Sequence, residues 1–271
     1  QKVANPDVLA KFETAWGVKM NRTPGLMATE CFPAMIDGRI KALFLFGEDP
    51  VRTDPDTHHV IHALESLDFL VVEELFMTET AKYADVILPG RSYAEKEGTF
   101  TNTERRVQRV RKAVKGPDGP RLDTEVFAEI MRRMGYDQPS LSASQIMEEI
   151  ASLTPSYAGI SHARLDGAQV AGRGIQWPCP SEDHPGTAIM HVGQFSRGKG
   201  GYSLAQYRPS AELPNAEYPL MLMTGRVLAQ YNACAMTGRT EGLNEIAGES
   251  FIELNSVDAE QLGVADGDRV R

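Results

Sequence analysis

The side chains with the clearest capacity for chemistry stand in the stretch FLFGEDPVRTD, residues 44–54, where an apolar segment runs directly into a glycine and two carboxylates. In open α/β sheets, ligands bind at the carboxyl ends of the strands. There, Glu48 or Asp49 could accept two hydrogen bonds from an amidine-like edge, such as the N1–H and exocyclic amine of guanine. The alternative is that Asp49 and Asp54 cap the next helix. The spacing alone leaves both roles open.

Three other groups of residues have the composition of a functional site. His58, His59 and His62 place two imidazoles one helical turn apart, but no third metal ligand accompanies them, and we predict a solvated helix face. The stretch RGKGG, residues 197–201, resembles a phosphate cradle without the strand that would precede one, so we predict a flexible loop. The stretch TNTERRVQRVRKAVK, residues 101–115, taken in isolation predicts an exposed basic edge made by Arg105, Arg106, Arg109, Arg111, Lys112 and Lys115.

Several classes of site lack their motifs. No GxGxxG follows a predicted strand, GxxxxGK[ST] is absent, and no Ser/His/Asp or Cys/His constellation can be assembled. Cys31, Cys179 and Cys234 lie far apart without a CxxC pair, so we predict buried free thiols and neither a zinc site nor an iron–sulfur cluster within these residues. A formal net charge of −9 argues against a nonspecific nucleic-acid binder, which needs a basic field.

The elements that must position these residues alternate in type. Apolar strands are predicted at residues 41–46, 69–72 and 86–88, with a helix opened by Pro55 after the first and a short helix at 78–83. Strands that are apolar throughout and alternate with helices are typical of a parallel sheet covered on both faces. The predicted fold class is therefore α/β, with a parallel sheet flanked by helices.

Helices are also predicted outside this unit, between Asn5 and Gly17, over residues 124–134 and after Ser142, which has capping-box spacing to the residue three positions later. From about residue 155 to 214 the chain is rich in Gly, Pro, Ser and His and has little periodicity. We expect this part to be a long irregular excursion over the surface.

The character of the chain changes after Tyr218. LMLMT, FIEL and the LGVADGDRV tail predict short strands joined by tight turns, which would begin an all-β domain. With 271 residues, of which 42% are hydrophobic, the chain can bury a sizeable core in one large or two ordinary domains. We divide it into an α/β part, residues 1–214, and the start of a β part, residues 215–271.

The extent of the chain leads to two further expectations. No apolar run reaches ~18 residues and no charged-then-apolar leader is present, so we expect no membrane span, no export signal within these residues and a cytoplasmic protein. The sequence begins at Gln1 and stops where a new strand would begin, and we interpret it as an internal piece of a longer polypeptide.

Four blocks of the sequence carry a resemblance to a known family: FLFGEDPVRTDP, FMTETAKYADVILPGRSYAEKEGTFTNTERRVQRVRKAV, IQWPCP and EYPLMLMTGRVLAQYNACAMTGRT. In that order they resemble the molybdopterin oxidoreductase (DMSO reductase) family. ADVILP and EGTFTNTERRVQ are specific to this larger family of molybdenum- or tungsten-dependent enzymes. GEDP, IQWPCP and the stretch from TGR to MTG resemble, within it, the catalytic (alpha) subunits of formate dehydrogenases.

The resemblance implies a cofactor and the residues that hold it. The cofactor is bis(molybdopterin guanine dinucleotide) with Mo or W, and residues 215–271 would begin a dinucleotide-binding β-barrel of the double-psi type. Matched residue by residue, the guanosine pocket would comprise Gly47, Glu48, Asp49 and Thr53, joined by Glu73 and Asp85, with Asp49 the best match for the guanine edge. The pterin and phosphates would be held by Thr224, Gly225, Arg226, Gln230, Tyr231, Asn232, Met236 and Thr237. Many relatives carry His where this chain has Gln230.

The resemblance also implies that the active-site equipment lies elsewhere. The cysteine or selenocysteine that ligates the metal, its neighbouring histidine and the cysteines of a [4Fe–4S] cluster match no residue of this chain, so they are expected in an N-terminal part. We therefore assign no catalytic residue and no metal ligand here. The 271 residues alone are expected to be inactive.

The function that the resemblance implies is the two-electron oxidation of formate to CO2, or its reverse. The expected partners are formate or CO2, the rest of the same polypeptide, and iron–sulfur or other electron-transfer subunits, without nucleic acid. Two alternatives stay open: another family member acting on nitrate or a similar oxo-anion, and a non-catalytic relative of the large iron–sulfur subunit of respiratory complex I. Such relatives tend to lose the guanine loop and the TGR to MTG stretch, both of which are present here.

Overall fold

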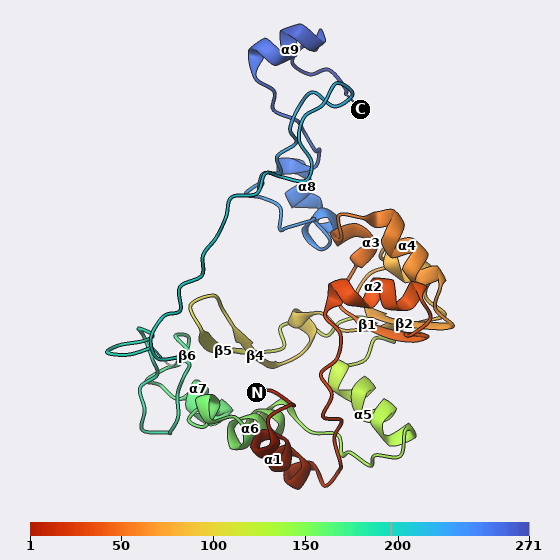
Figure 1. The fold of residues 1–271 in the computed structure, drawn as a ribbon. Coiled ribbons are helices and arrows are strands. Elements are labelled where there is room, and N and C mark those ends of the chain that lie inside the picture. The colour runs from red at the N-terminus through yellow and green to blue at the C-terminus, as the bar shows by residue number, and fades with distance from the viewer. Residues whose placement is uncertain (196, 271) are drawn as a thin grey trace. The chain divides into compact units, whose positions relative to one another are not determined.

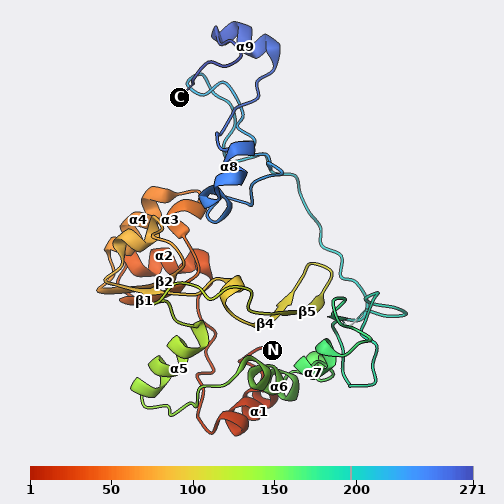
Figure 2. The ribbon, with the colours of Figure 1, turned by 180° about the vertical axis from the view of Figure 1, so that it is seen from behind.

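The computed structural model describes residues 1–195 and 197–270, which form two compact units (Figures 1 and 2). The first unit contains residues 1–51 and 56–206, and the second contains residues 52–55 together with the described chain from residue 207 onward.

A parallel three-stranded sheet forms the centre of the first unit, as the sequence predicts. Its strands follow the chain order β1, β2, β3, with bounds Ala42–Phe46, Phe69–Glu74 and Val86–Pro89. Phe46 lies beside Glu73 and Glu73 lies beside Leu88, so the carboxyl ends of the strands meet at one edge. The connections contain α3 (Pro50–Thr53), α4 (Thr57–Glu65) and the short 3₁₀ helix η1 (Thr80–Tyr83).

Helices lie on both faces of this sheet (Figures 1 and 2). On one face, α4 and α2 (Ala28–Ile36) pack over a core that contains Val60, Leu64 and Leu70. On the other face, α5 (Asp123–Arg133) approaches through one aromatic side chain. The ring of Phe127 lies 5.8 Å from that of Phe44 and 5.2 Å from that of Phe46, and both pairs meet edge to face.

The predicted helix signals are largely confirmed. The side chain of Asn5 accepts hydrogen bonds from the first turn of α1 (Pro6–Trp16), and Gly17 ends this helix in the left-handed conformation. Ser142 caps α6 (Ala143–Leu153). The cap of α4 falls two residues later than Asp54, because Asp56 accepts a hydrogen bond from the backbone N–H of His59 at 3.1 Å.

A second, antiparallel sheet was not predicted. Strands β4 (Gly98–Thr101) and β5 (Arg106–Val110) form a hairpin, and β6 (Ile175–Gln176) pairs with β5. Its core contains Val107 and Ile175 with Met147, Ile160, Leu165 and Cys179. The expectation of an irregular excursion from about residue 155 is therefore wrong over its first third, where η3 (Pro155–Tyr157), α7 (His162–Asp166) and β6 lie. The apolar residues there are too widely spaced to show a period.

His162, the first residue of α7, makes this core sensitive to acid. Its side chain is buried, and its Nε2 has no hydrogen-bond partner among the described residues. Burial and the positive charge of Arg109 lower the pKa of His162 below its ordinary value of 6.5, although Asp166, Glu97 and Glu148 act in the opposite direction. The unfolded chain therefore binds this proton more readily than the folded chain.

We expect the stability that depends on neutral His162 to be complete above pH 6.5. The unfolding free energy should then fall as the pH drops from 6.5 through the lowered pKa of His162. Urea denaturation on both sides of this window measures the effect. His162→Gln, which cannot be protonated, should show a shallower dependence, whereas the exposed control His58→Gln should retain the full dependence. Identical slopes for His162→Gln and the unchanged protein would contradict the assignment.

The second unit is helical where it is regular. It contains η4 (Thr237–Arg239), α8 (Glu241–Ala247) and α9 (Ser256–Leu262), and no described residue after Gln176 belongs to a strand. The strands predicted at LMLMT and FIEL are therefore not formed. No other described segment pairs with them, so their backbone groups form no ladder and Leu222 stays 83% exposed. Asn255 caps α9 and Gly263 ends it, so a helix that was not predicted lies between FIEL and the LGVADGDRV tail.

All three cysteines are free, as predicted, but only Cys179 is buried, while Cys31 and Cys234 are half-buried. Within the described ranges, no helix combines the length and apolar character that crossing a lipid bilayer requires.

Candidate functional site

The loop after β1 leaves its backbone open to a ligand. Gly47 has φ +61°, a conformation that favours glycine, and its N–H donates to the carbonyl of Glu73 at 2.9 Å. A Cβ atom at Gly47 would meet no described atom within 4 Å. Glu48, the next residue, is exposed. The chain turns away from the sheet at this position, at the edge where open parallel sheets bind ligands.

Asp49 is the buried anchor of this loop. Asp49 is 4% exposed, and its Oδ1 accepts hydrogen bonds from the backbone N–H of Thr80 at 3.0 Å and from the Thr80 hydroxyl at 2.6 Å. The Thr80 hydroxyl oxygen in turn accepts from the N–H of Val51 at 3.1 Å. The first turn of α3 is thus satisfied through Thr80, and Asp49 fastens the loop to η1. Thr53, the last residue of α3, is exposed.

Glu73 lies at the same edge, at the end of β2, and is 1% exposed. Burial raises the pKa of Glu73 to about 7, the negative charge of Asp123 adds to this rise, and Lys96 opposes it. Lys96 and Asp123 form an ion pair, with side chains 28% and 19% exposed. Gly47, Asp49 and Glu73 are therefore brought together as expected, but Glu73 faces a carboxylate that the sequence did not indicate.

Asp85 lies at the opposite edge of the sheet. It precedes β3, and its Oδ2 accepts a hydrogen bond from the N–H of Leu70 at 2.7 Å, near the start of β2. In a parallel sheet, the residue before a strand stands at the amino-end edge. The structure therefore does not bring Asp85 to the edge that holds Gly47, Asp49 and Glu73.

The other predicted site residues lie in the second unit, around a hollow of about 300 Å³ lined by Thr224, Gly225, Arg226, Val227, Gln230 and Asn232. The guanidinium of Arg226 donates to the side-chain oxygen of Asn232 at 2.8 Å, and Asn232 has φ +48°. The side chain of Gln230 donates to the carbonyl of Ala247 at 2.7 Å, and its oxygen is buried without a partner in the described chain. An Arg fork beside amide groups suits phosphate and the mixed donor and acceptor edge of a pterin.

The remaining residues of this group surround the turn before η4. The N–H of Tyr231 donates to the hydroxyl of Thr237 at 3.0 Å, which closes the turn. Met236 and the ring of Tyr231 are exposed. The second unit therefore brings most of its predicted site residues to one loop and one hollow.

The predicted basic edge is largely neutralised by acids. Arg109 pairs with Glu97 and with Asp166, Arg111 pairs with the same Asp166, and further pairs are Arg106 with Glu104 and Lys115 with Asp118. Glu104 and Asp118 lie within three residues of their partners, whereas Asp166 comes from α7, which is remote in sequence and could not be assigned from the sequence. The basic stretch contributes β5 and its contacts rather than an uncompensated positive surface.

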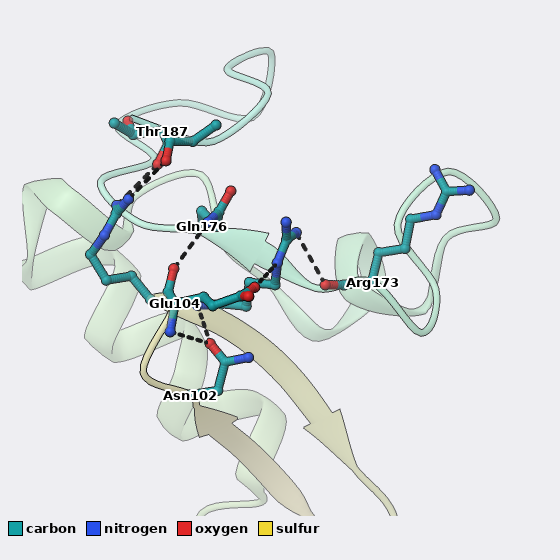
Figure 3. Close-up of polar contacts among 8 residues, drawn as sticks. Asn102, Glu104, Arg173, Gln176 and Thr187 are labelled. Carbon is teal, nitrogen blue, oxygen red and sulfur yellow. Dashed lines mark hydrogen bonds and ion pairs between the residues drawn. The ribbon is translucent and has the colours of Figure 1, made fainter. Parts of the chain in front are cut away.

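The hairpin turn between β4 and β5 is a polar junction that the sequence reasoning missed (Figure 3). The side-chain oxygen of Asn102 accepts from the N–H groups of Glu104 and Arg106, both at 3.0 Å. Gln176 donates to the carbonyl of Glu104 at 3.0 Å, and Arg105 donates to the carbonyl of Thr187 at 3.0 Å. Asn two residues before Glu is an Asx-turn signal that could have located this turn.

Within residues 1–195 and 197–270, no group of three or more His, Cys, Asp or Glu side chains is placed to hold a metal ion. His58, His59 and His62 belong to α4, where His58 and His62 are exposed.

Two family models match the chain. The molybdopterin oxidoreductase model matches residues 4–133, and the molydopterin dinucleotide binding domain matches residues 220–271. The F420-dependent formate dehydrogenase subunit alpha of Methanocaldococcus jannaschii is 44% identical over 267 residues, which cover 96% of this chain and 38% of that protein. The F420-dependent formate dehydrogenase 2 subunit alpha of Methanococcus maripaludis is 42% identical over 276 residues, which cover 100% of this chain and 40% of that protein.

A putative formate dehydrogenase of Staphylococcus haemolyticus is 38% identical over 273 residues, covering 100% of this chain and 27% of that protein. The chain thus spans 27% to 40% of the length of these curated relatives. Among solved structures, acetylene hydratase from Pelobacter acetylenicus is similar, with a TM-score of 0.43 and 22% identity over 58% of this chain and 22% of that one. A likeness of this size assigns no function.

Proposed function

The chain belongs to the molybdopterin oxidoreductase family, and from this membership we propose that it is part of the catalytic subunit of a formate dehydrogenase or CO2 reductase. The observation that carries the proposal is the similarity of nearly the whole chain to formate dehydrogenase alpha subunits at 42% and 44% identity. The polar groups at the carboxyl edge of the parallel sheet and around the Arg226 hollow support it.

The cofactor that we propose is bis(molybdopterin guanine dinucleotide) with Mo or W. When bound, it would accept the two electrons that formate loses when it is converted to CO2 and a proton. Two features fit it: the open backbone of Gly47 suits a closely packed nucleoside, and the Arg226 hollow offers a guanidinium and amides to phosphate and pterin. Thr224, Gly225, Asn232 and Gln230 would line that second site, with Tyr231, Met236 and Thr237 beside it.

We assign different tasks to the two carboxylates after β1. Asp49 Oδ1 already accepts two hydrogen bonds from Thr80, which suits a residue that fixes the loop. Glu48 is exposed, and its carboxylate can present two acceptor oxygens to the donor edge of guanine. The geometry therefore favours Glu48 as the residue that contacts the base and Asp49 as the residue that fixes the loop. Thr53 follows this loop, at the end of α3.

Glu48→Gln tests this division. It replaces one acceptor oxygen with an N–H₂ donor opposite the donor edge of guanine, so we expect the guanine nucleotide content of the purified intact protein to fall severalfold. The unfolding free energy of the variant should stay within about 0.5 kcal/mol of that of the unchanged protein, because the side chain of Glu48 is exposed. Glu65→Gln, at an exposed position on α4, is the matched control. Unchanged nucleotide content in Glu48→Gln would remove Glu48 from the proposed base contact.

The remaining equipment is proposed to lie outside these 271 residues. It comprises the metal-ligating cysteine or selenocysteine, a [4Fe–4S] cluster, and the iron–sulfur or other subunits that carry electrons away. The protein's share here is to hold and orient the cofactor.

The activity is tested with the intact protein by following the reduction of an artificial electron acceptor with formate, and the oxidation of a reduced dye with nitrate. We expect formate-dependent turnover and none with nitrate. Nitrate turnover without formate turnover, in protein that contains the metal, would overturn the formate assignment and leave the family membership intact.

A further inference from the structure

The carboxyl group of Glu73 is buried in an arrangement that an ionised carboxylate does not satisfy. Glu73 is 1% exposed, and neither Oε1 nor Oε2 accepts a hydrogen bond from any described donor. An ionised carboxylate without donors is costly to bury. The backbone carbonyl of Glu73 is engaged by the N–H of Gly47 at 2.9 Å, so the side chain is held at the carboxyl edge of the sheet.

Two charged groups face Glu73. In addition to burial, the negative charge of Asp123, the first residue of α5, raises the pKa of Glu73, and Lys96, which follows the 3₁₀ helix η2 (Tyr93–Glu95), lowers it. The two carboxyl groups converge on Gly90, where an added Cβ would lie 3.5 Å from Asp123 Oδ1 and 3.8 Å from Glu73 Oε1. Lys96 is ion-paired with Asp123.

The charges of this group balance only with one extra proton. Two carboxylates and one ammonium give a net charge of −1 in a largely buried space, and two acceptor-only groups that face each other repel. One proton on Glu73 supplies the missing donor, because a protonated carboxyl has an O–H that can bond to the other carboxylate. Asp123 is the natural acceptor, since its pairing with Lys96 favours its ionised form.

We propose that Glu73 is a proton-binding site whose O–H donates to the Asp123 carboxylate, so that Glu73, Asp123 and Lys96 form a neutral triad that ties the start of α5 to the carboxyl edge of the sheet. The triad is distinct from the guanine contacts assigned to the loop after β1, and it holds whether or not formate is the substrate.

The ionisation of Glu73 should also change stability. Its pKa in the folded chain is raised from 4.5 to about 7, so the folded state binds the proton more tightly than the unfolded state. Stability from this group is fully present below pH 4.5 and is lost as the pH rises through about 7. The direction is opposite to that expected of His162, so the two groups can be separated by substitution.

Infrared difference spectroscopy on the intact protein tests the proposal. Subtracting the spectrum of Glu73→Gln from that of the unchanged protein isolates the Glu73 carboxyl. We expect a protonated-carboxyl band at about pH 6 that disappears with a midpoint near 7. Glu74→Gln, one residue further along β2, is the matched control and should retain this band, because Glu74 already accepts a hydrogen bond from the N–H of Leu75 at 2.7 Å. A band absent at pH 6, or a midpoint near 4.5, would overturn the proposal.

A second variant keeps the test decisive if Glu73→Gln fails to fold. Asp123→Asn removes the facing charge and offers an amide N–H₂ that can donate to an ionised Glu73, so the protonated-carboxyl band should disappear at a clearly lower pH. The same band and midpoint in Asp123→Asn as in the unchanged protein would show that Asp123 does not share the proton.

Discussion

Asp49→Ala is expected to lower the unfolding free energy by about 3 kcal/mol and to reduce the guanine nucleotide content of the intact protein. The substitution removes the acceptor of two hydrogen bonds, and Thr80, which donates both, is fully buried. Hydrogen bonds to charged groups contribute about 1.5–3 kcal/mol each, and an abandoned buried N–H adds a desolvation cost. Without this tether, the loop from Gly47 to Val51 loses its fixed link to η1.

Chemical denaturation and nucleotide release measure the two effects of Asp49→Ala. Asp49→Asn is the matched control, because its side-chain carbonyl can still accept from Thr80, and the expected loss is about 1 kcal/mol. Stability of Asp49→Ala within about 1 kcal/mol of the unchanged protein would contradict the anchoring role. A large loss of stability with full nucleotide content would show that the loop does not take part in binding.

Gly159→Ala is expected to have the largest effect on folding, a loss of about 4 kcal/mol or more. A Cβ at this position would lie 2.0 Å from the carbonyl oxygen of Ser181 and 2.4 Å from its carbonyl carbon. Both are backbone atoms, so the chain cannot yield by turning a side chain. The N–H of Gly159 also donates to the carbonyl of Cys179 at 2.8 Å, which holds the two segments together.

Thermal or urea denaturation measures the effect of Gly159→Ala. The control is Gly98→Ala at the start of β4, where an added Cβ would meet no described atom within 4 Å, so the change should be within about 0.5 kcal/mol. Equal stability of the two variants would mean that the segments around residues 159 and 181 are not packed as described.

The parallel sheet was predictable because its strands are short apolar runs with helical segments between them, and parallel pairing follows from that alternation. The antiparallel sheet was not. Within β5 only Val107 is buried, and its partner strand β6 comes about seventy residues later, at Ile175. A strand that buries one side chain shows no period, and a partner so distant in sequence leaves no local signal.

The candidate site was predictable in outline for a similar reason. Gly47, Asp49 and Glu73 follow or end adjacent parallel strands, so their meeting at one edge follows from strand direction. Their partners, Thr80 for Asp49 and Asp123 for Glu73, come from separate elements whose positions depend on tertiary packing.

Two expectations differ from the observed structure: the place of Asp85, which the resemblance implied, and the strand at LMLMT, which the residue pattern predicted. Asp85 precedes its strand and so stands at the amino-end edge, which strand direction alone could have shown. The segment LMLMT is apolar enough for a strand, yet strand formation requires a partner, and none of the described residues supplies one.

The central claim is that this chain helps to hold a guanine-containing molybdopterin cofactor, and one measurement tests it most directly. The intact protein is purified from a host that makes the cofactor, its molybdenum and tungsten are quantified, and the nucleotide released by acid is identified. We expect one of the two metals together with GMP, at about two GMP per metal for a bis(guanine dinucleotide) cofactor. Protein that contains neither metal and releases no guanine nucleotide would contradict the claim.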